Sequence, residues 1–219
     1  LHKTVGVPDP EKIDSIELGY MAAFKSIPLT FDAKLFKERI SPTINFADDA
    51  STDCPSCVFY NGASGNFNND GKVEINGFEL QLDLQATANT NIHAIYSHLN
   101  ATGYQVNDYD NTGLPARYHD VSKIVPTKTY GILASHHFDN GINVSAGLHH
   151  TSMMTWLDPG NKTDAYNKWD FRIAKKFTLP DATIDVAAIL HNITDDDYQE
   201  YYNGNQAQRE FHLQIGVKF

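Results

Sequence analysis

Apolar and polar residues alternate along most of this chain, and the alternation is clearest at its C-terminal end. Residues 209–219 place apolar side chains at every second position: Phe211, Leu213, Ile215, Val217 and Phe219. Successive side chains of a β-strand point to opposite faces, so the pattern predicts a strand with one wholly apolar face. A transmembrane β-barrel strand needs about ten residues that alternate between lipid and lumen, and this stretch meets that requirement.

Similar alternation predicts further strands upstream. In residues 73–85, Phe78, Leu80, Leu82 and Leu84 point one way, and the polar residues between them point the other. The polar set would face solvent in a soluble sheet and a wet lumen in a barrel. The other predicted strands cover residues 15–24, 29–40, 92–99, 127–138, 142–156, 169–177 and 183–190. Together these segments predict an all-β, antiparallel up-and-down fold of about nine strands.

The connections between the predicted strands alternate in length. Tight turns are expected near residues 25–28, 87–91, 139–141 and 179–182, and polar loops at 41–72, 100–123, 157–168 and 192–208. A meander across a membrane places short turns on the periplasmic side and long loops outside, whereas a Greek-key sandwich has no reason to alternate. Aromatic residues near the loop-side strand ends fit an interfacial girdle: Tyr104, Trp156, Trp169, Tyr198, Tyr201 and Tyr202.

The odd number of predicted strands determines whether the sheet can close into a barrel by itself. Bacterial single-chain barrels have even strand numbers, and an odd antiparallel set cannot close without one parallel pair. Open sheet edges are not tolerated in lipid. The pattern therefore favours either an overlooked strand or, given the start at Leu1, a part of a larger barrel.

Composition narrows the functional classes. The 219 residues are 41% hydrophobic and 20% charged, and no run of about 18 apolar residues could form a membrane-spanning helix. The formal net charge of −10 argues against nucleic acid as a partner, which would require a basic face. Three acidic groups fall in predicted loops, where solvation is the favoured interpretation: Asp48 with Asp49, Asp108 with Asp110, and residues 195–197.

The two cysteines, Cys54 and Cys57, form a Cys-Pro-Ser-Cys motif in a polar loop. A redox site would need this motif at a helix start in a βαβ unit, and a zinc site would need two more ligands at set spacing. A small loop-closing disulfide in an oxidising compartment is the favoured interpretation.

No catalytic constellation or cofactor site is predicted, and the chain is not expected to be an enzyme. Ser, His and Asp occur without a Gly-x-Ser-x-Gly elbow. The histidine pairs His136–His137 and His149–His150 lie too far apart along their strands to share one metal. Four carboxylates on polar strand faces are expected to line a solvated lumen: Glu79, Asp83, Asp170 and Asp185.

Cations and loop aromatics are the remaining candidates for ligand contact. Four cations fall on polar faces of the predicted strands near the end of the chain: Arg172, Lys176, Arg209 and Lys218. They could hold carboxylates of a plug or attract an anionic chelate. Aromatic side chains in the loops could stack on a small ligand: Tyr104, Tyr109, Tyr118, Tyr201 and Tyr202. Girdle or lumen lining is the favoured interpretation for all of them.

Several motifs, in order, resemble the C-terminal barrel of TonB-dependent outer-membrane receptors. Residues 10–20 (Pro-Glu-Lys-Ile-Asp-Ser-Ile-Glu-Leu-Gly-Tyr), the Leu-Thr-Phe-Asp-Ala-Lys-Leu-Phe segment from Leu29, and residues 73–81 resemble its strands. Residues 190–198 (Leu-His-Asn-Ile-Thr-Asp-Asp-Asp-Tyr) resemble its Asn-[Leu/Ile]-x-Asp-x-x-Tyr segment. The ending on Phe219 resembles the signal by which the insertion machinery recognises outer-membrane proteins.

This resemblance implies that residues 1–219 are the last nine strands of a 22-stranded barrel whose plug and TonB box lie outside the chain. It implies a bacterial outer-membrane location and TonB-dependent uptake of a scarce nutrient, with a ferric siderophore favoured. The implied partners are the rest of the barrel and the plug, the TonB complex, the insertion machinery, lipid and lipopolysaccharide, and a small-molecule metal chelate. Two alternatives stay open: a self-contained small outer-membrane pore or adhesin, and a secreted β-sandwich binding module.

Overall fold

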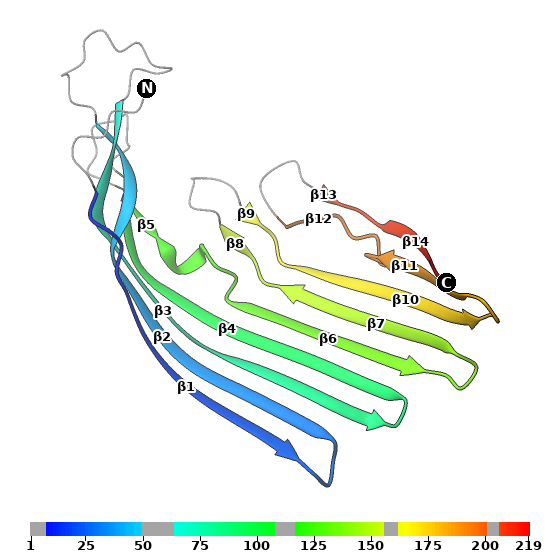
Figure 1. The fold of residues 1–219 in the computed structure, drawn as a ribbon. Helices are drawn as coiled ribbons and strands as arrows, with labels where there is room; N and C mark the ends of the chain where they lie inside the picture. The colour runs from blue at the N-terminus through cyan, green and yellow to red at the C-terminus, as the bar shows by residue number, and fades with distance from the viewer. Residues whose placement is uncertain (1–7, 50–63, 108–116, 156–161, 201–205) are drawn as a thin grey trace. The chain divides into compact units, whose positions relative to one another are not determined.

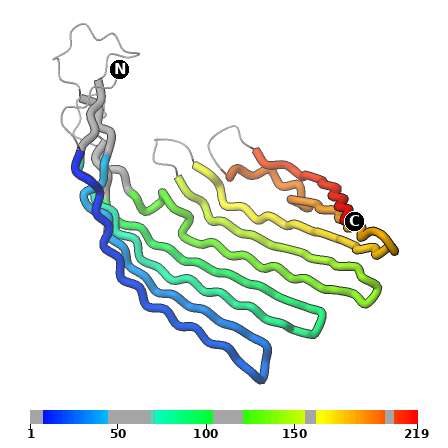
Figure 2. Tube along the Cα trace, viewed as in Figure 1, coloured from blue at the N-terminus to red at the C-terminus, as the bar shows by residue number. Residues whose placement is uncertain are grey.

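A computed structural model describes residues 8–49, 64–107, 117–155, 162–200 and 206–219. Nine long strands form one sheet in chain order, β1-β2-β3-β4-β6-β7-β10-β11-β14 (Figures 1 and 2). The pairings along the sheet from β4 to β14 are all antiparallel, so the sheet is an up-and-down meander there. The long strands are β1 Ile13–Phe24, β2 Leu29–Asp49, β3 Ser64–Thr87, β4 Thr90–Asn107, β6 Lys128–His137, β7 Ile142–Thr151, β10 Tyr166–Thr178, β11 Thr183–His191 and β14 Glu210–Lys218.

Short elements accompany the long strands. β5 (Arg117–Asp120) pairs with β4 and leads into a 3₁₀ turn, η1 (Val121–Lys123). β8 (Met154–Thr155) pairs with β9 (Lys162–Thr163), and β12 (Tyr198–Gln199) pairs with β13 (Gln206–Ala207). The chain divides into two compact units, of which the first holds residues 1–17, 36–76 and 100–125, and the second holds residues 18–35, 77–99 and 126–219.

In the second unit, tight turns join the long strands in pairs at one end of the sheet (Figure 1). Thr87 Oγ1 and Thr90 Oγ1 lie 2.8 Å apart across the β3–β4 turn. In the β6–β7 turn, Gly141 adopts a φ of 79°, which a side chain would disfavour, and Asn140 Oδ1 accepts a hydrogen bond from the Ile142 amide at 3.1 Å. These turns confirm the predicted hairpins.

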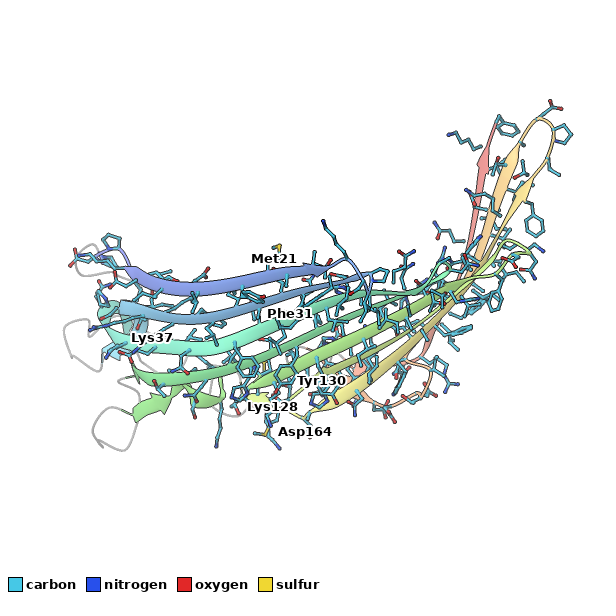
Figure 3. The ribbon with its side chains drawn as sticks, turned by 90° about the horizontal axis from the view of Figure 1, so that it is seen from below. Met21, Phe31, Lys37, Lys128, Tyr130 and Asp164 are labelled. Atoms are coloured by element: carbon cyan, nitrogen blue, oxygen red, sulfur yellow. The ribbon has the colours of Figure 1, made fainter. Side chains whose placement is uncertain are left out.

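Side chains stand off both faces of the sheet in the second unit (Figure 3). Strand alternation separates apolar from polar side chains between these two faces. Large apolar side chains remain exposed along both edge strands; Leu18 on β1 is 68% exposed and Phe211 on β14 is 65% exposed. Among the described residues, the buried hydrophobic side chains are Val73, Ala101, Val121, Ala187 and Tyr198. A soluble sheet needs a second layer over its apolar face, and the described residues do not provide one.

The first unit contains a small core at a close approach of two strands. Gly103 in β4 has a φ of 133°, and a Cβ placed there would lie 2.0 Å from the carbonyl oxygen of Lys72 in β3. Val121, in η1, is fully buried. Asp9 and Asn69 exchange two hydrogen bonds: the Asp9 amide donates to Asn69 Oδ1 at 2.7 Å, and Asn69 Nδ2 donates to the Asp9 carbonyl at 2.8 Å. These contacts tie the segment before β1 to β3.

Four predicted loops are shorter than expected because strands extend into them. In the segment predicted as loop 41–72, β2 continues to Asp49 and β3 begins at Ser64. In segment 100–123, β4 continues to Asn107 and β5 pairs with it, and in segment 157–168, β10 already begins at Tyr166. The 192–208 loop holds the β12–β13 pair. Ladder hydrogen bonds join backbone groups, so a polar sequence can continue a strand without apolar alternation.

Candidate functional site

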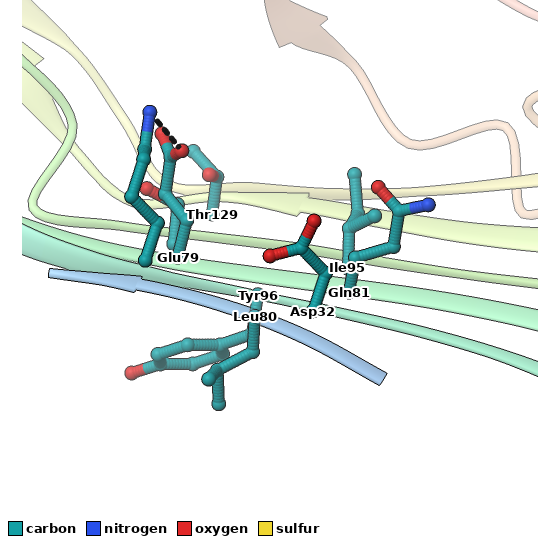
Figure 4. Close-up of a pocket in the computed structure, with 9 residues that line it drawn as sticks. Asp32, Glu79, Leu80, Gln81, Ile95, Tyr96 and Thr129 are labelled. Atoms are coloured by element: carbon teal, nitrogen blue, oxygen red, sulfur yellow. Dashed lines mark ion pairs between the residues drawn. The ribbon is translucent and has the colours of Figure 1, made fainter. Parts of the chain in front are cut away.

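The polar face of the sheet is the candidate functional site, because it gathers the charged side chains that strand alternation turns away from the apolar face. In the close-up of β2, β3 and β4, Asp32, Glu79 and Gln81 project to one side of the sheet, and Leu80 and Tyr96 project to the other (Figure 4). This arrangement confirms the predicted two-faced pattern of the strand at residues 73–85.

A network of polar side chains crosses β2, β3 and β4 on this face. Lys34 Nζ forms an ion pair with Glu79 Oε2 at 2.9 Å. Asp83 accepts a hydrogen bond from Gln81 Nε2 at 2.9 Å and lies 2.5 Å from His93 Nδ1. The predicted lumen-lining carboxylates Glu79 and Asp83 therefore each have a partner on this face. An open hollow of about 360 Å³ lies beside Lys34 and Glu79.

A second polar cluster spans β10, β11 and the segment that follows β12. Asp170 Oδ1 lies 3.2 Å from His191 Nδ1, and Asp170 Oδ2 lies 3.9 Å from Lys168 Nζ. Lys168 Nζ also lies 3.8 Å from Glu200 Oε1. His149 is the register partner of Lys168 across β7 and β10. Acidic, basic and imidazole groups of neighbouring strands thus lie side by side in this cluster.

Aromatic stacking joins this cluster to the β12–β13 hairpin. Tyr198 is 8% exposed, and its ring lies against that of Tyr166 with centroids 4.4 Å apart and planes inclined by 19°. Burial, helped by the charge and the hydrogen bond of the Glu200 carboxylate, raises the pKa of the Tyr198 phenol well above its ordinary value. The phenol therefore stays neutral throughout the physiological pH range.

The segment that resembles the family's Asn-[Leu/Ile]-x-Asp-x-x-Tyr motif fixes the chain after β11. Asn192 is 1% exposed, adopts a φ of 50° and donates from Nδ2 to the Asp196 carbonyl at 2.9 Å. Its backbone amide donates to Asp170 Oδ1 at 3.1 Å. Asp195, with a φ of 59°, accepts from the Arg209 amide at 3.2 Å. The motif is therefore a structural turn that places Tyr198 against β10.

The predicted cations have different roles. Arg172 and Lys176 both line an open hollow of about 690 Å³ near the tight turns, where Lys176 Nζ lies 3.8 Å from Asp185 Oδ1. Arg209 precedes β14, and its guanidinium donates to the Ile193 carbonyl at 2.8 Å, so its assignment to a polar strand face was wrong. Arg209 lies outside the strand because the turn after β11 folds back toward the start of β14. Lys218 is the register partner of Thr183 at the end of β14.

The histidine pairs are separated, as the sequence predicts. His136 Nδ1 lies 2.8 Å from Thr90 Oγ1 near the tight turns, whereas the His150 ring stacks on Tyr130 at 4.5 Å. His137 pairs in register with Asn143, and His149 pairs with Gly131. Among the described residues, no group of three or more His, Cys, Asp or Glu side chains is placed to hold a metal ion.

The remaining sequence candidates fall partly outside the described residues. The backbones of Tyr104 and Tyr118 lie in β4 and β5, two register positions apart, because Tyr104 pairs with Asp120 and Tyr118 pairs with Val106. The segments outside the described residues hold Cys54, Cys57, Tyr109, Trp156, Tyr201 and Tyr202. The predicted C-terminal strand forms as β14, and Phe219, which follows it, is 96% exposed.

The sequence pattern missed Lys168, His191, Glu200 and the stacking role of Tyr166. The predicted strand began at residue 169, which hid the alternation Tyr166-x-Lys168-x-Asp170-x-Arg172 on one face. An earlier strand start would have revealed this polar row. Glu200 joins the cluster through a turn, which no strand periodicity could predict.

Within the described part of the chain, no helix has the length and apolar character needed to cross a bilayer.

Comparison with known proteins assigns the family. The family model described as "TonB dependent receptor-like, beta-barrel" matches residues 3–193. No curated protein sequence gives a significant match. Among solved structures, the siderophore receptor PiuA from Acinetobacter baumannii has a TM-score of 0.71 at 18% identity, covering 98% of this chain and 30% of that chain.

Two further solved structures are similar. The ferric-catecholate import receptor Fiu from K12 E. coli has a TM-score of 0.65 at 18% identity, covering 95% of this chain and 27% of that chain. The ferric preacinetobactin receptor BauA from Acinetobacter baumannii has a TM-score of 0.65 at 14% identity, covering 96% of this chain and 30% of that chain. The chain thus spans less than a third of these proteins, and at these identities the likeness shows the fold alone. The family match over residues 3–193 shows that the chain belongs to the TonB-dependent receptor-like β-barrel family.

Proposed function

We propose that this chain forms part of the wall of a bacterial outer-membrane receptor that takes up a scarce nutrient in a TonB-dependent manner. The observation that carries the proposal is the two-faced single sheet. Its exposed apolar face suits lipid, and its polar face, with pairs such as Lys34–Glu79, suits a hydrated lumen. Barrels of this family are outer-membrane proteins, which supports that location for this chain.

The proposed substrate class is a ferric siderophore. The structural neighbours include receptors titled as siderophore and ferric-chelate receptors, which supports this choice. The Lys168–Asp170–His191 cluster and the Tyr166–Tyr198 stack provide charged, imidazole and aromatic groups side by side, a combination that suits a polar chelate with aromatic parts. The loop tyrosines and the Cys54–Cys57 disulfide stay predictions within this proposal.

The proposal includes a barrel completed by further strands and a plug. In the described sheet, β1 and β14 are the two edges, each pairing with a single neighbour. An antiparallel sheet with an odd number of long strands cannot close by antiparallel pairing of its first and last members. This argues against the alternative of a self-contained small pore. The apolar edge strands instead suit pairing with additional barrel strands inside lipid.

An uptake experiment tests the function. A strain that lacks the gene should fail to accumulate radioactive iron from at least one member of a siderophore panel under iron limitation. The wild-type gene should restore uptake only in a background with functional TonB. Uptake that continues in a TonB-deficient strain would support the passive pore instead. Normal growth and uptake of every chelate in the deletion strain would refute the proposed substrate class.

Membrane fractionation tests the location separately. The protein should sediment with outer membranes and require detergent for release, because Leu18, Phe211 and similar side chains are exposed on the apolar face. A protein that stays folded and soluble without detergent would contradict both the receptor and the pore.

A further inference from the structure

Two histidines on the polar face of the second unit lie close together on neighbouring strands. His191 ends β11, and His212 lies in β14. In the β11–β14 register, His191 pairs with Glu210, which is two residues before His212. Residues two apart on a strand share a face, so both imidazoles stand on the same side of the sheet, one diagonal step apart. Their ring centroids lie 5.4 Å apart, and the ring planes are inclined by 70°.

The spacing of the two rings suits a metal ion between them. An imidazole nitrogen lies about 2.0–2.1 Å from a bound zinc ion, so the ring centroids of two histidines on one ion lie no more than about 6.5 Å apart. The observed separation of 5.4 Å is within this limit. Small rotations of the two side chains therefore suffice to aim one nitrogen of each ring at a common point.

Each of the two imidazoles also has a carboxylate beside one ring nitrogen. Asp170 Oδ1 lies 3.2 Å from His191 Nδ1, and Glu210 Oε2 lies 3.2 Å from His212 Nε2. A carboxylate favours the proton on the nitrogen that it faces, which leaves the lone pair on the other nitrogen of the ring. Carboxylates next to metal-binding histidines act in this way, since they fix the tautomer and make the free nitrogen a stronger ligand. The ligand atoms would thus be His191 Nε2 and His212 Nδ1.

The histidine pair is accessible, and its surroundings are negative on balance. The side chains of His191 and His212 are 40% and 54% exposed. Lys168 Nζ is shared between Asp170 and Glu200, at 3.9 and 3.8 Å, so it does not cancel both carboxylates. Three carboxylates and two cations of β10, β14 and the segment that follows β12 lie around the pair: Asp170, Glu200, Glu210, Lys168 and Arg172. This balance favours a cation over an anion at the imidazoles.

We propose that His191 and His212 form a two-imidazole binding site for a divalent transition-metal ion such as Cu²⁺, Ni²⁺ or Zn²⁺, with Asp170 and Glu210 orienting the rings. Imidazole is a preferred ligand of these ions, whereas Mg²⁺ and Ca²⁺ are bound through oxygen. Two protein ligands leave the other coordination positions to water or to donor atoms of a small molecule. The site therefore takes a metal ion that keeps exchangeable ligands. This inference goes beyond the proposed uptake of a ferric siderophore and does not depend on it.

His93 provides a matched control on the same polar face. Its Nδ1 contacts Asp83 Oδ1, so it is also an imidazole with a carboxylate partner. Its register partner on β6 is Leu133, which offers no second imidazole. The variants His191→Gln, His212→Gln and His93→Gln each remove one imidazole, and only the first two alter the proposed site. A fourth variant, Glu210→Gln, keeps both imidazoles and removes the charge of one orienting carboxylate.

The test uses the full-length protein, purified in mild detergent and freed of metal with a chelator. The affinity for Cu²⁺ is measured by competition with a fluorescent chelator. We expect His191→Gln and His212→Gln each to lower the affinity about 100-fold, and Glu210→Gln to lower it about tenfold. His93→Gln should leave the affinity unchanged. An equal loss in His93→Gln, or an unchanged affinity in His191→Gln or His212→Gln, would overturn the site.

Pulsed electron paramagnetic resonance identifies the ligands directly in the wild-type protein. With one equivalent of Cu²⁺, we expect couplings to two imidazoles in wild type and in His93→Gln, and to one imidazole in His191→Gln and His212→Gln. A wild-type spectrum with a single imidazole would refute the two-histidine site. A protein that restores siderophore uptake but lacks these couplings refutes this inference alone. A protein that shows the couplings but restores no uptake refutes only the proposed function.

Discussion

The Tyr198 ring lies nearly parallel to the Tyr166 ring at a centroid distance of 4.4 Å, and this contact holds the β12–β13 hairpin against β10. The two residues are separated by the whole of β11 and the Asn192 turn. The side chain of Tyr198 is nearly covered, and its stack on Tyr166 connects the hairpin to the long strands.

Truncation of Tyr198 should release the hairpin. We expect Tyr198→Ala to lower the free energy of local opening by about 3 kcal/mol, as for aromatic truncations in packed sites, and to speed exchange of the Gln199 and Ala207 amides about 100-fold. Tyr198→Phe keeps the ring and should cost about 1 kcal/mol or less. Hydrogen exchange with mass spectrometry measures both, and equal exchange in Tyr198→Ala and wild type would contradict the stacking role.

The hairpin should also loosen at high pH. The pKa of Tyr198 is raised in the folded chain, so its stabilising contribution is fully present below the ordinary tyrosine pKa of about 10 and is lost as the pH rises through the folded value. Hairpin protection, corrected for intrinsic exchange, should be constant from about pH 7 to 9 and fall above about pH 10. In Tyr198→Phe this fall should disappear; a fall that persists would assign the titration to another group.

The left-handed backbone at Asn192 predicts an order among substitutions. Asn192→Gly keeps the φ of 50° but removes the hydrogen bond to Asp196, and should destabilise by about 1–2 kcal/mol. Asn192→Ala also places a Cβ in a disfavoured region and should cost about 1 kcal/mol more. Thermal unfolding of the detergent-solubilised protein measures the difference. The interpretation fails if the alanine variant is as stable as the glycine variant.

The contact between Gly103 and Lys72 should tolerate no side chain. Gly103→Ala would place its Cβ 2.0 Å from a backbone oxygen, so we expect a loss of more than about 3 kcal/mol and little folded protein in the membrane. Gly131→Ala is the control, because its Cβ would meet Ile95 Cγ1 at 3.2 Å and that side chain can move. We expect the control to cost less than about 1.5 kcal/mol. Comparable membrane levels of the two variants would refute the argument.

Deletion of Phe219 should impair assembly more than stability. Phe219 follows β14, and its ring is 96% exposed, so it adds little packing to the folded sheet. We expect the deletion to reduce the amount of protein in outer membranes several-fold, while the melting temperature of the protein that does assemble changes by only a few degrees. Unchanged outer-membrane levels would count against an assembly signal at Phe211, Leu213, Ile215, Val217 and Phe219.

Alternation predicted the long strands well because their two faces meet different surroundings. β11 is the predicted strand at residues 183–190 with one residue added, and Ile184, Val186 and Ala188 share one face of it. The same signal failed beyond Ile40 in β2 and before Val73 in β3, where polar residues continue the strands. Backbone hydrogen bonds hold those extensions together. Such bonds do not require side chains of alternating polarity, so the sequence pattern does not reveal them.

The polar cluster was predicted in part. Glu79, Asp83, Asp170 and Asp185 lie on the polar face, as strand parity predicts. Their partners could not be predicted, because partner choice depends on register between strands that are far apart in sequence. Arg209 shows the limit most clearly: its contact with Ile193 depends on the left-handed turn at Asn192, which is a local backbone choice rather than a periodic pattern.

The pairing of opposite charges on the polar face has a consequence for long-range electrostatics. Lys34 with Glu79 and Lys176 with Asp185 act as small dipoles, and the field of a dipole falls off faster with distance than that of a single charge. A charged group near this face is therefore attracted mainly by the ion-pairing side chains next to it, and only weakly by the face as a whole.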